Sequence, residues 1–157
     1  MKKKIKWIIT GISVMSVVVM IYIGALVQYA ESEAIALNRY AESLEAMSEV
    51  DAVRSIHRFN GLESYVVALV ALTHHQEVYF FVRDGAIKHY VGSDELMTES
   101  QVASLALNLI VGGEVHHIQL GIIEETPIFE VQIVFEDVRH YVIIHAVDGH
   151  VITNFNL

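Results

Sequence analysis

The chain has 157 residues, of which 54% are hydrophobic, and 19 acidic against 10 basic residues give it a formal net charge of −9. So acidic a composition argues against nucleic acid as a partner. The sequence has no cysteine, so no disulfide can constrain the unfolded chain and an exported domain would depend on a packed core. The length allows one domain or two small ones after any targeting segment.

The first predicted element is a membrane-spanning helix over residues 7–27, preceded by a basic tail, residues 1–6. These 21 uncharged residues are long enough, at about 1.5 Å of rise each, to cross a hydrocarbon core of roughly 30 Å. The tail holds four basic residues, whereas residues 28–157 hold six basic and all 19 acidic ones. We therefore expect a single-pass cell-membrane protein with a cytoplasmic N-terminus and an extracytoplasmic C-terminal domain. A cleaved secretory signal ending before Ile35 is the alternative.

A second helical segment follows the membrane span. Residues 28–48 contain no Gly or Pro, and their apolar residues recur at helical spacing. This stripe consists of Leu37, Tyr40, Ala41, Leu44 and Met47. The segment either continues the membrane helix as a stalk or restarts after a break near Ala30.

After Val50 the hydrophobic period changes to two, which is typical of strands. Strands are predicted over residues 64–72, 78–83 and 86–91, with turns at Asn60-Gly61 and Asp84-Gly85. The first half of the domain is therefore expected to be an antiparallel sheet that follows a helix.

The same order is predicted again in the second half. Thr98, with Gln101 three residues later, predicts a helix N-terminus, and Gly112-Gly113 ends that helix. Four further strands are expected, over residues 115–122, 128–135, 140–147 and 150–154, with a turn at Asp148-Gly149.

The two halves align at a constant offset of 64 residues, which indicates an internal duplication. Tyr65 then corresponds to Phe129, and Asp84 to Asp148. We expect one unit over residues 28–92, stalk helix included, and a second over residues 93–157. Chance similarity between two Asp-Gly hairpins is the alternative.

The hairpins assign side chains to faces if each Asp-Gly pair occupies the two central turn positions. One face of each sheet then packs on its helix. The other face is too apolar to lie in water, and it is either a partner-binding surface or the place where the two units pack together. The candidate partner-binding residues on it are Tyr79, Phe81, Tyr90, Tyr141, Ile143 and His145.

Motifs for catalysis or metal binding are not found in the sequence. His145 and His150 are the one plausible metal-ligand pair, predicted to lie diagonally across a turn at about 7 to 8 Å. Two ligands are too few unless Asp148 joins them, so we expect neither a metal nor another cofactor. The acidic pairs Glu124-Glu125 and Glu136-Asp137 are expected to be solvated loop charges, and no nucleophile has an adjacent base. The protein is therefore expected not to be an enzyme.

The segment from Phe129 to Ile152, with its strands and Asp-Gly hairpin, resembles the PepSY motif. The whole arrangement, including Phe59 to Val67 at the start of the first unit, resembles the TseB-like (YpmB-type) family of cell-wall elongation regulators of Gram-positive bacteria. The resemblance implies an α+β fold of two cystatin-like units, each a helix packed on an antiparallel sheet. His74-His75 departs from the family at a turn usually filled by Lys, Asp or Gly.

The resemblance also implies a function. Members of that family are regarded as associating with a class B penicillin-binding protein and modulating lateral wall synthesis without catalysis. We therefore expect a non-enzymatic, membrane-anchored adaptor that regulates peptidoglycan synthesis by docking on a penicillin-binding protein. The alternatives are a PepSY-type protease inhibitor and an extracytoplasmic ligand sensor.

Overall fold

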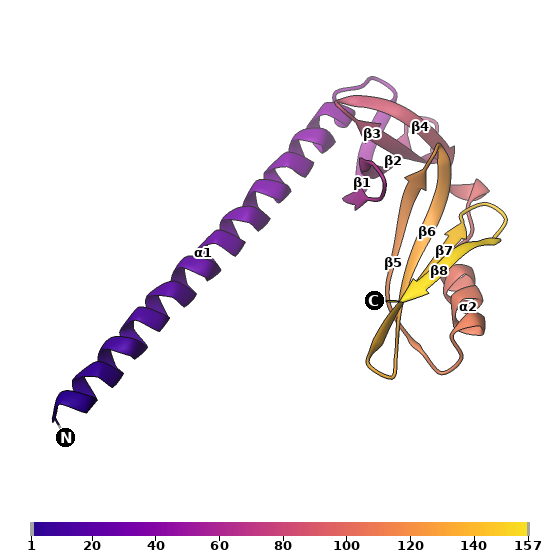
Figure 1. Cartoon of the computed structure of the whole chain (residues 1–157). Coiled ribbons are helices and arrows are strands. Elements are labelled where there is room, and N and C mark those ends of the chain that lie inside the picture. The colour runs from indigo at the N-terminus through magenta and orange to yellow at the C-terminus, as the bar shows by residue number, and fades with distance from the viewer. Residues whose placement is uncertain (1, 157) are drawn as a thin grey trace. The chain divides into compact units, whose positions relative to one another are not determined.

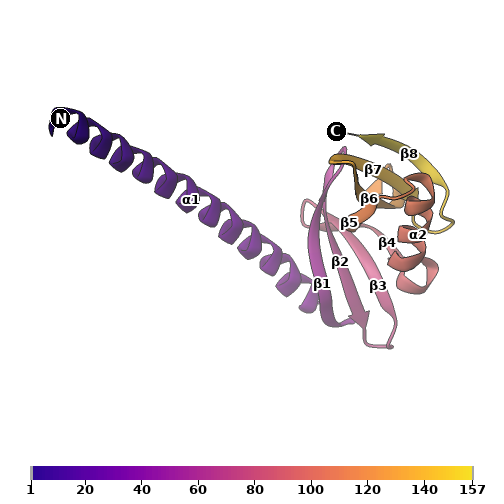
Figure 2. The same cartoon turned by 90° about the horizontal axis from the view of Figure 1, so that it is seen from below.

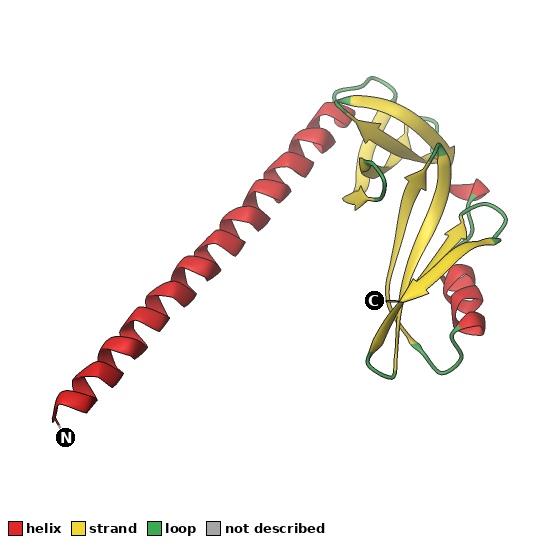
Figure 3. Cartoon of the chain, in the orientation of Figure 1, coloured by secondary structure: helices red, strands yellow, loops and turns green. Residues whose placement is uncertain are grey.

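The computed structural model describes the backbone of residues 2–156, and the side chains of residues 2–14, 16 and 17 lie outside the description. Most side chains of the first half of the predicted membrane span are thus not described. The backbone forms one helix, α1, from Lys2 to Glu45, so the predicted membrane span and the predicted stalk form a continuous helix (Figure 3). Among the described residues its segment Val18–Glu45 has the length and composition of a membrane span, a criterion that an N-terminal secretory signal also meets.

The chain divides into two compact units, Met1–Arg39 and Tyr40–Leu157. The second unit contains two four-stranded antiparallel sheets, each with its strands in chain order (Figures 1 and 2). The first sheet consists of β1 (Val50–Asn60), β2 (Ser64–Leu72), β3 (Glu77–Arg83) and β4 (Ala86–Gly92). A 3-10 turn (Ser93–Glu95) and helix α2 (Glu99–Leu109) lead to the second sheet, which consists of β5 (Glu114–Ile123), β6 (Thr126–Phe135), β7 (Val138–His145) and β8 (Val151–Asn156).

Local sequence accounts for these elements, and the predicted strands and second helix are confirmed to within two residues. Thr98 caps α2, because its hydroxyl accepts from the Gln101 backbone N–H at 3.3 Å and its own N–H donates to the Gln101 side chain at 2.8 Å. Two-residue turns with positive φ at both positions join three strand pairs, a conformation that matches the twist of the strands. They are Asp84-Gly85, Glu124-Glu125 and Glu136-Asp137.

The last hairpin differs from the prediction. Residue Ile144 pairs with Val151, so residues 146–150 form a loop, and Asp148-Gly149 is not a two-residue turn. Gly149 has φ +77°, whereas Asp148 is not in the left-handed region. The Asp-Gly dipeptide is the same as in the Asp84-Gly85 hairpin, but the register of the two strands differs. His145 is the last residue of β7 and His150 is the last residue of the loop, so the two do not lie diagonally across a two-residue turn.

The two sheets share one hydrophobic core. Strand β5 contacts β1 and β2, while α2 lies against β5 and β6. His57 Nε2 lies 2.9 Å from the Leu120 carbonyl oxygen, and Gln119 Nε2 donates to the Arg58 carbonyl at 2.8 Å. Gly121 lies against the Phe59 ring so closely that a Cβ there would be 2.4 Å from the ring. The buried residues of this core come from both sheets and α2, and include Phe59, Val67, Phe81, Val102, Ala106, Phe129, Val131, Ile143 and Ile144.

The apolar faces predicted to be covered, either by a partner or by the other unit, are mostly buried within the chain. Packing of the two halves against one another, the alternative considered above, covers Phe81, which is 0% exposed, and Ile143 is also buried. The opposite face of the first sheet is buried as well, through Val66, Val70 and Val82. At the end of α1, Leu44 is buried, and Glu45 accepts a hydrogen bond from the Val53 N–H at 3.2 Å.

Candidate functional site

The six predicted partner-binding residues do not form one surface. Phe81 and Ile143 are members of the shared core, so they are not available to a partner. Tyr79 packs against that core, and burial, followed by the charges of Glu99 and Glu77, raises the pKa of its phenol. The three others are accessible to different degrees: Tyr90 is exposed on β4, while Tyr141 and His145 are half-buried on β7.

Strand β8 is the exposed edge beside β7. Every residue of β8 is exposed, and in the described part of the chain β8 pairs with β7 on one side and with no strand on the other. Its apolar residues Val151, Ile152 and Phe155 are 40%, 45% and 46% exposed. The Phe155 ring stacks on Tyr141 with ring centroids 5.2 Å apart, so this aromatic surface is ordered by contact within the hairpin.

Strand β8 lacks most of the features that discourage pairing at a sheet edge. Edge strands of soluble proteins are commonly protected by Lys, by Pro or by bulges. Strand β4, the edge of the first sheet, carries Lys88 in its centre, whereas β8 has no charge and no Pro. The one irregularity in the pairing of β8 lies at its beginning, opposite Ile143 and Ile144. An extended segment of another chain could therefore add to β8 as a fifth strand.

A compact group of three polar side chains lies beside β8, in the loop that precedes it. One carboxylate oxygen of Asp148, Oδ1, is 2.8 Å from Nδ1 of His145 and 2.8 Å from Nδ1 of His150. The two imidazole rings stack with centroids 4.8 Å apart and planes inclined by 21°. Hydrogen bonds from the His150 backbone N–H, then from its ring, lower the pKa of the Asp148 carboxyl to about 2.

Backbone contacts fix the loop that carries this group. The Gly149 N–H donates to the His145 carbonyl at 3.0 Å, and the His145 N–H donates to the His150 carbonyl at 2.9 Å. Ala146 is held from both sides, since its N–H donates to Pro127 and its carbonyl accepts from Met97. A Cβ on Gly149 would be 2.7 Å from the Met97 sulfur, so the loop is packed against the segment that leads into α2.

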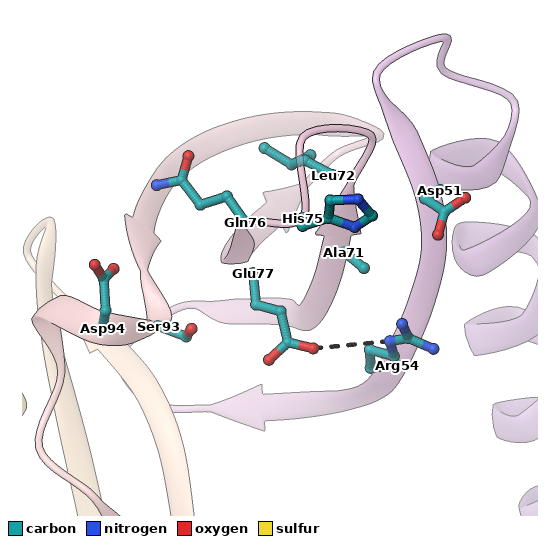
Figure 4. A pocket seen from close by; sticks show the side chains of 9 residues that line it. All are labelled: Asp51, Arg54, Ala71, Leu72, His75, Gln76, Glu77, Ser93 and Asp94. Atoms are coloured by element: carbon teal, nitrogen blue, oxygen red, sulfur yellow. Dashed lines mark ion pairs between the residues drawn. The ribbon is translucent and has the colours of Figure 1, made fainter.

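Several hollows lie on the surface of the second unit. One, of about 470 Å³, is open and is lined by Asp51, Arg54, His75 and Glu77 among others. Figure 4 shows its charged side chains, with the Arg54–Glu77 ion pair at 3.7 Å across it. A second, of about 240 Å³, lies beside Tyr79 and is smaller than the 300 to 1,000 Å³ usual for ligand pockets.

The residues that sequence reasoning missed are those of β8. Their exposure follows from the position of β8 at the edge of the sheet, beyond the cover of α2, and no pattern within Val151–Asn156 indicates that position. From the sequence, His145 and His150 are a diagonal pair across a turn, too few for a metal unless Asp148 joins them. The structure brings all three side chains together.

These features define a class of protein: an N-terminal apolar helix followed by an α+β unit with two four-stranded antiparallel sheets. No family model matches the chain, and comparison with curated proteins gives no match. The fold is similar to that of the YpmB protein from Bacillus subtilis, with a TM-score of 0.64 and 15% identity over 81% of this chain and 96% of that one. A Clostridium difficile 630 chain described as a lipoprotein matches with a TM-score of 0.43 and 11% identity, over 81% and 92% of the two chains.

Proposed function

We propose that this protein is a non-enzymatic adaptor, held at the outer face of the cell membrane by its N-terminal helix, that regulates cell-wall elongation by docking on a membrane-anchored penicillin-binding protein. The observation that carries the docking part is β8, an uncharged edge strand with all its residues exposed. The similarity of fold to YpmB and the candidate membrane span in α1 support an extracytoplasmic place for the second unit.

Strand addition supplies a physical mechanism for docking. Backbone hydrogen bonds along β8 would give affinity, and its exposed apolar side chains, among them Ile152 and Phe155, would select the sequence of the added strand. The acidic surface of residues 28–157 favours a partner segment with basic flanks. A short strand of this kind binds weakly, but anchoring both proteins in one membrane raises their effective concentration, so weak contacts suffice.

The test places a photo-reactive amino acid at Ile152 of the full chain and cross-links it in cells. The cross-linked products are then treated with fluorescent penicillin, which labels penicillin-binding proteins covalently. Tyr90, at the edge of the other sheet and 69% exposed, is the matched control position. We expect a penicillin-labelled adduct from position 152 and little or none from position 90.

A paired substitution separates docking from folding. Ile152→Lys places a charge at the edge of the sheet and should remove the adduct formed from a probe at Phe155, whereas Tyr90→Lys should leave it. Both sites are exposed, so both variants should keep wild-type stability to within about 0.5 kcal/mol. Equal adducts from positions 152 and 90, or no penicillin-labelled adduct at all, would contradict the proposed docking.

A further inference from the structure

The loop between β7 and β8 brings together three side chains whose chemistry suits a transition-metal ion. Among the described side chains, His145, Asp148 and His150 form a group in which one ligand atom from each lies within 4.8 Å of the others. Two imidazoles and a carboxylate are ligands typical of Zn²⁺, and three protein ligands with a water at the fourth position form a common open site.

One carboxylate oxygen of Asp148 is the shared partner of the other members of this group. Both Nδ1 atoms point at the same oxygen of Asp148, each at 2.8 Å, and that oxygen also accepts from the His150 backbone N–H at 3.1 Å. A cation placed between the three ligand atoms would let both imidazoles bind as neutral Nδ1 ligands, with their protons on Nε2.

Side-chain rearrangement is needed to admit the ion. Ligand atoms about 2.0 to 2.1 Å from a tetrahedral zinc are themselves about 3.3 Å apart, so each 2.8 Å contact must open by roughly half an ångström, and the ligand atoms that lie as far as 4.8 Å apart must come closer. The side chains of Asp148 and His150 are 60% and 59% exposed and are free to make that change. His145 is only 22% exposed and lies at the end of β7, so it supplies a fixed ligand.

The backbone of the loop is ordered without the ion. It is held by the hydrogen bonds from Ala146 to Pro127 and from Met97 to Ala146, and by the packing of Gly149 against Met97 and Leu105. Such preorganisation lowers the cost of bringing three ligands together. Binding would also join the end of β7 to the start of β8, and so stabilise the edge strand.

We propose that His145, Asp148 and His150 bind one Zn²⁺ ion, with water completing its coordination. This inference does not depend on the proposed docking function, because it rests on the loop and not on a partner.

The test titrates the full chain in detergent with Zn²⁺ in competition with a chromophoric chelator at neutral pH. We expect one high-affinity site per chain and a rise in melting temperature with excess zinc. His150→Ala and Asp148→Asn should each lower that affinity by about tenfold or more and remove the rise in melting temperature. Both side chains are exposed, so circular dichroism of the zinc-free variants should match the wild type.

Matched controls come from the other half of the chain. His74→Ala removes an exposed histidine, and Asp84→Asn changes the aspartate of the other Asp-Gly hairpin. Neither should alter zinc affinity. The proposal fails if the wild type shows no zinc site, or if zinc affinity falls as much with His74→Ala as with His150→Ala.

Discussion

At the scale of single residues, Phe81 tests whether the face that carries the predicted partner-binding residues of the first sheet belongs to the hydrophobic core. Its side chain is 0% exposed among residues of both sheets. Phe81→Ala should lower the free energy of unfolding by about 3 to 5 kcal/mol, because it removes an aromatic side chain and leaves a cavity. Pulse proteolysis in urea on the detergent-solubilised chain measures the change.

The control for that measurement is Tyr90→Ala on the adjacent strand. Tyr90 is 69% exposed, so its removal should change the unfolding free energy by no more than about 0.5 kcal/mol. A Phe81→Ala variant as stable as Tyr90→Ala would show that Phe81 is exposed in solution, and would restore it as a candidate contact.

Glu130, half-buried in the centre of the second sheet, should make stability depend on pH. Burial raises the pKa of its carboxyl above the ordinary 4.5, and the nearby His117 offsets this in part. Because the folded pKa is above the unfolded one, Glu130 favours the folded state when protonated, and this contribution falls as pH rises from about 4.5 through the folded pKa. Glu130→Gln should remove that decline.

The measurement is the difference in unfolding free energy between Glu130→Gln and wild type at several pH values. That difference should move in favour of the variant as pH increases above about 4.5. A flat profile for Glu130→Gln would exclude a desolvated carboxyl.

At the scale of elements, the two Asp-Gly hairpins have the same dipeptide but different surroundings. Gly85 and Gly149 have φ of +73° and +77°, and a Cβ on Gly85 meets nothing within 4 Å, whereas on Gly149 it would meet Met97 and Leu105 below 3.0 Å. Gly85→Ala should cost about 1 to 2 kcal/mol from the left-handed backbone alone. Gly149→Ala should cost about 1 to 3 kcal/mol more, from overpacking.

Urea unfolding of the two glycine variants gives both values directly. Similar losses at the two positions would show that the loop 146–150 is not packed against the segment before α2. The fixed loop is the basis of the metal proposal, so this comparison also tests its structural premise without any metal.

The elements themselves were largely predictable from local sequence. Strand alternation, the capping box at Thr98 and the breaks at Asp84-Gly85 and Gly112-Gly113 act within a few residues, and the structure has the strands and α2 where these signals place them. The loop at residues 146–150 was not predictable in this way, because its register depends on tertiary contacts of Ala146 with Pro127 and Met97.

At the scale of the whole molecule, the docking of the two sheets was the step that sequence could not specify. The alternation of apolar residues along the strands shows that Phe81 and Ile143 each lie on an apolar face of a sheet. It cannot show whether a partner or the other half of the chain covers those faces. The contact depends on pairs distant in sequence, such as Gly121 with Phe59 and His57 with Leu120. Because those faces are buried together, the candidate partner-binding surface that remains consists of β8 and the loop of residues 146–150.

The long helix α1 contains a segment with the length and composition of a membrane span, and such a span would attach the whole molecule to the membrane. If α1 anchors the second unit beside its partner, the helix contributes to function by raising effective concentration, and a released second unit should bind far less. This requirement follows from the weakness expected of a single exposed strand of six residues, Val151–Asn156.

The most direct test of the account compares the tethered protein with a released form. Residues 1–27 are replaced by a cleavable secretory signal, the photo-reactive probe is kept at Ile152, and the yield of penicillin-labelled adduct is measured at equal protein levels. The account predicts a strong adduct from the tethered chain and a yield about 100-fold lower from the released form. An undiminished yield from the released form, or no penicillin-labelled adduct from the tethered chain, would contradict it.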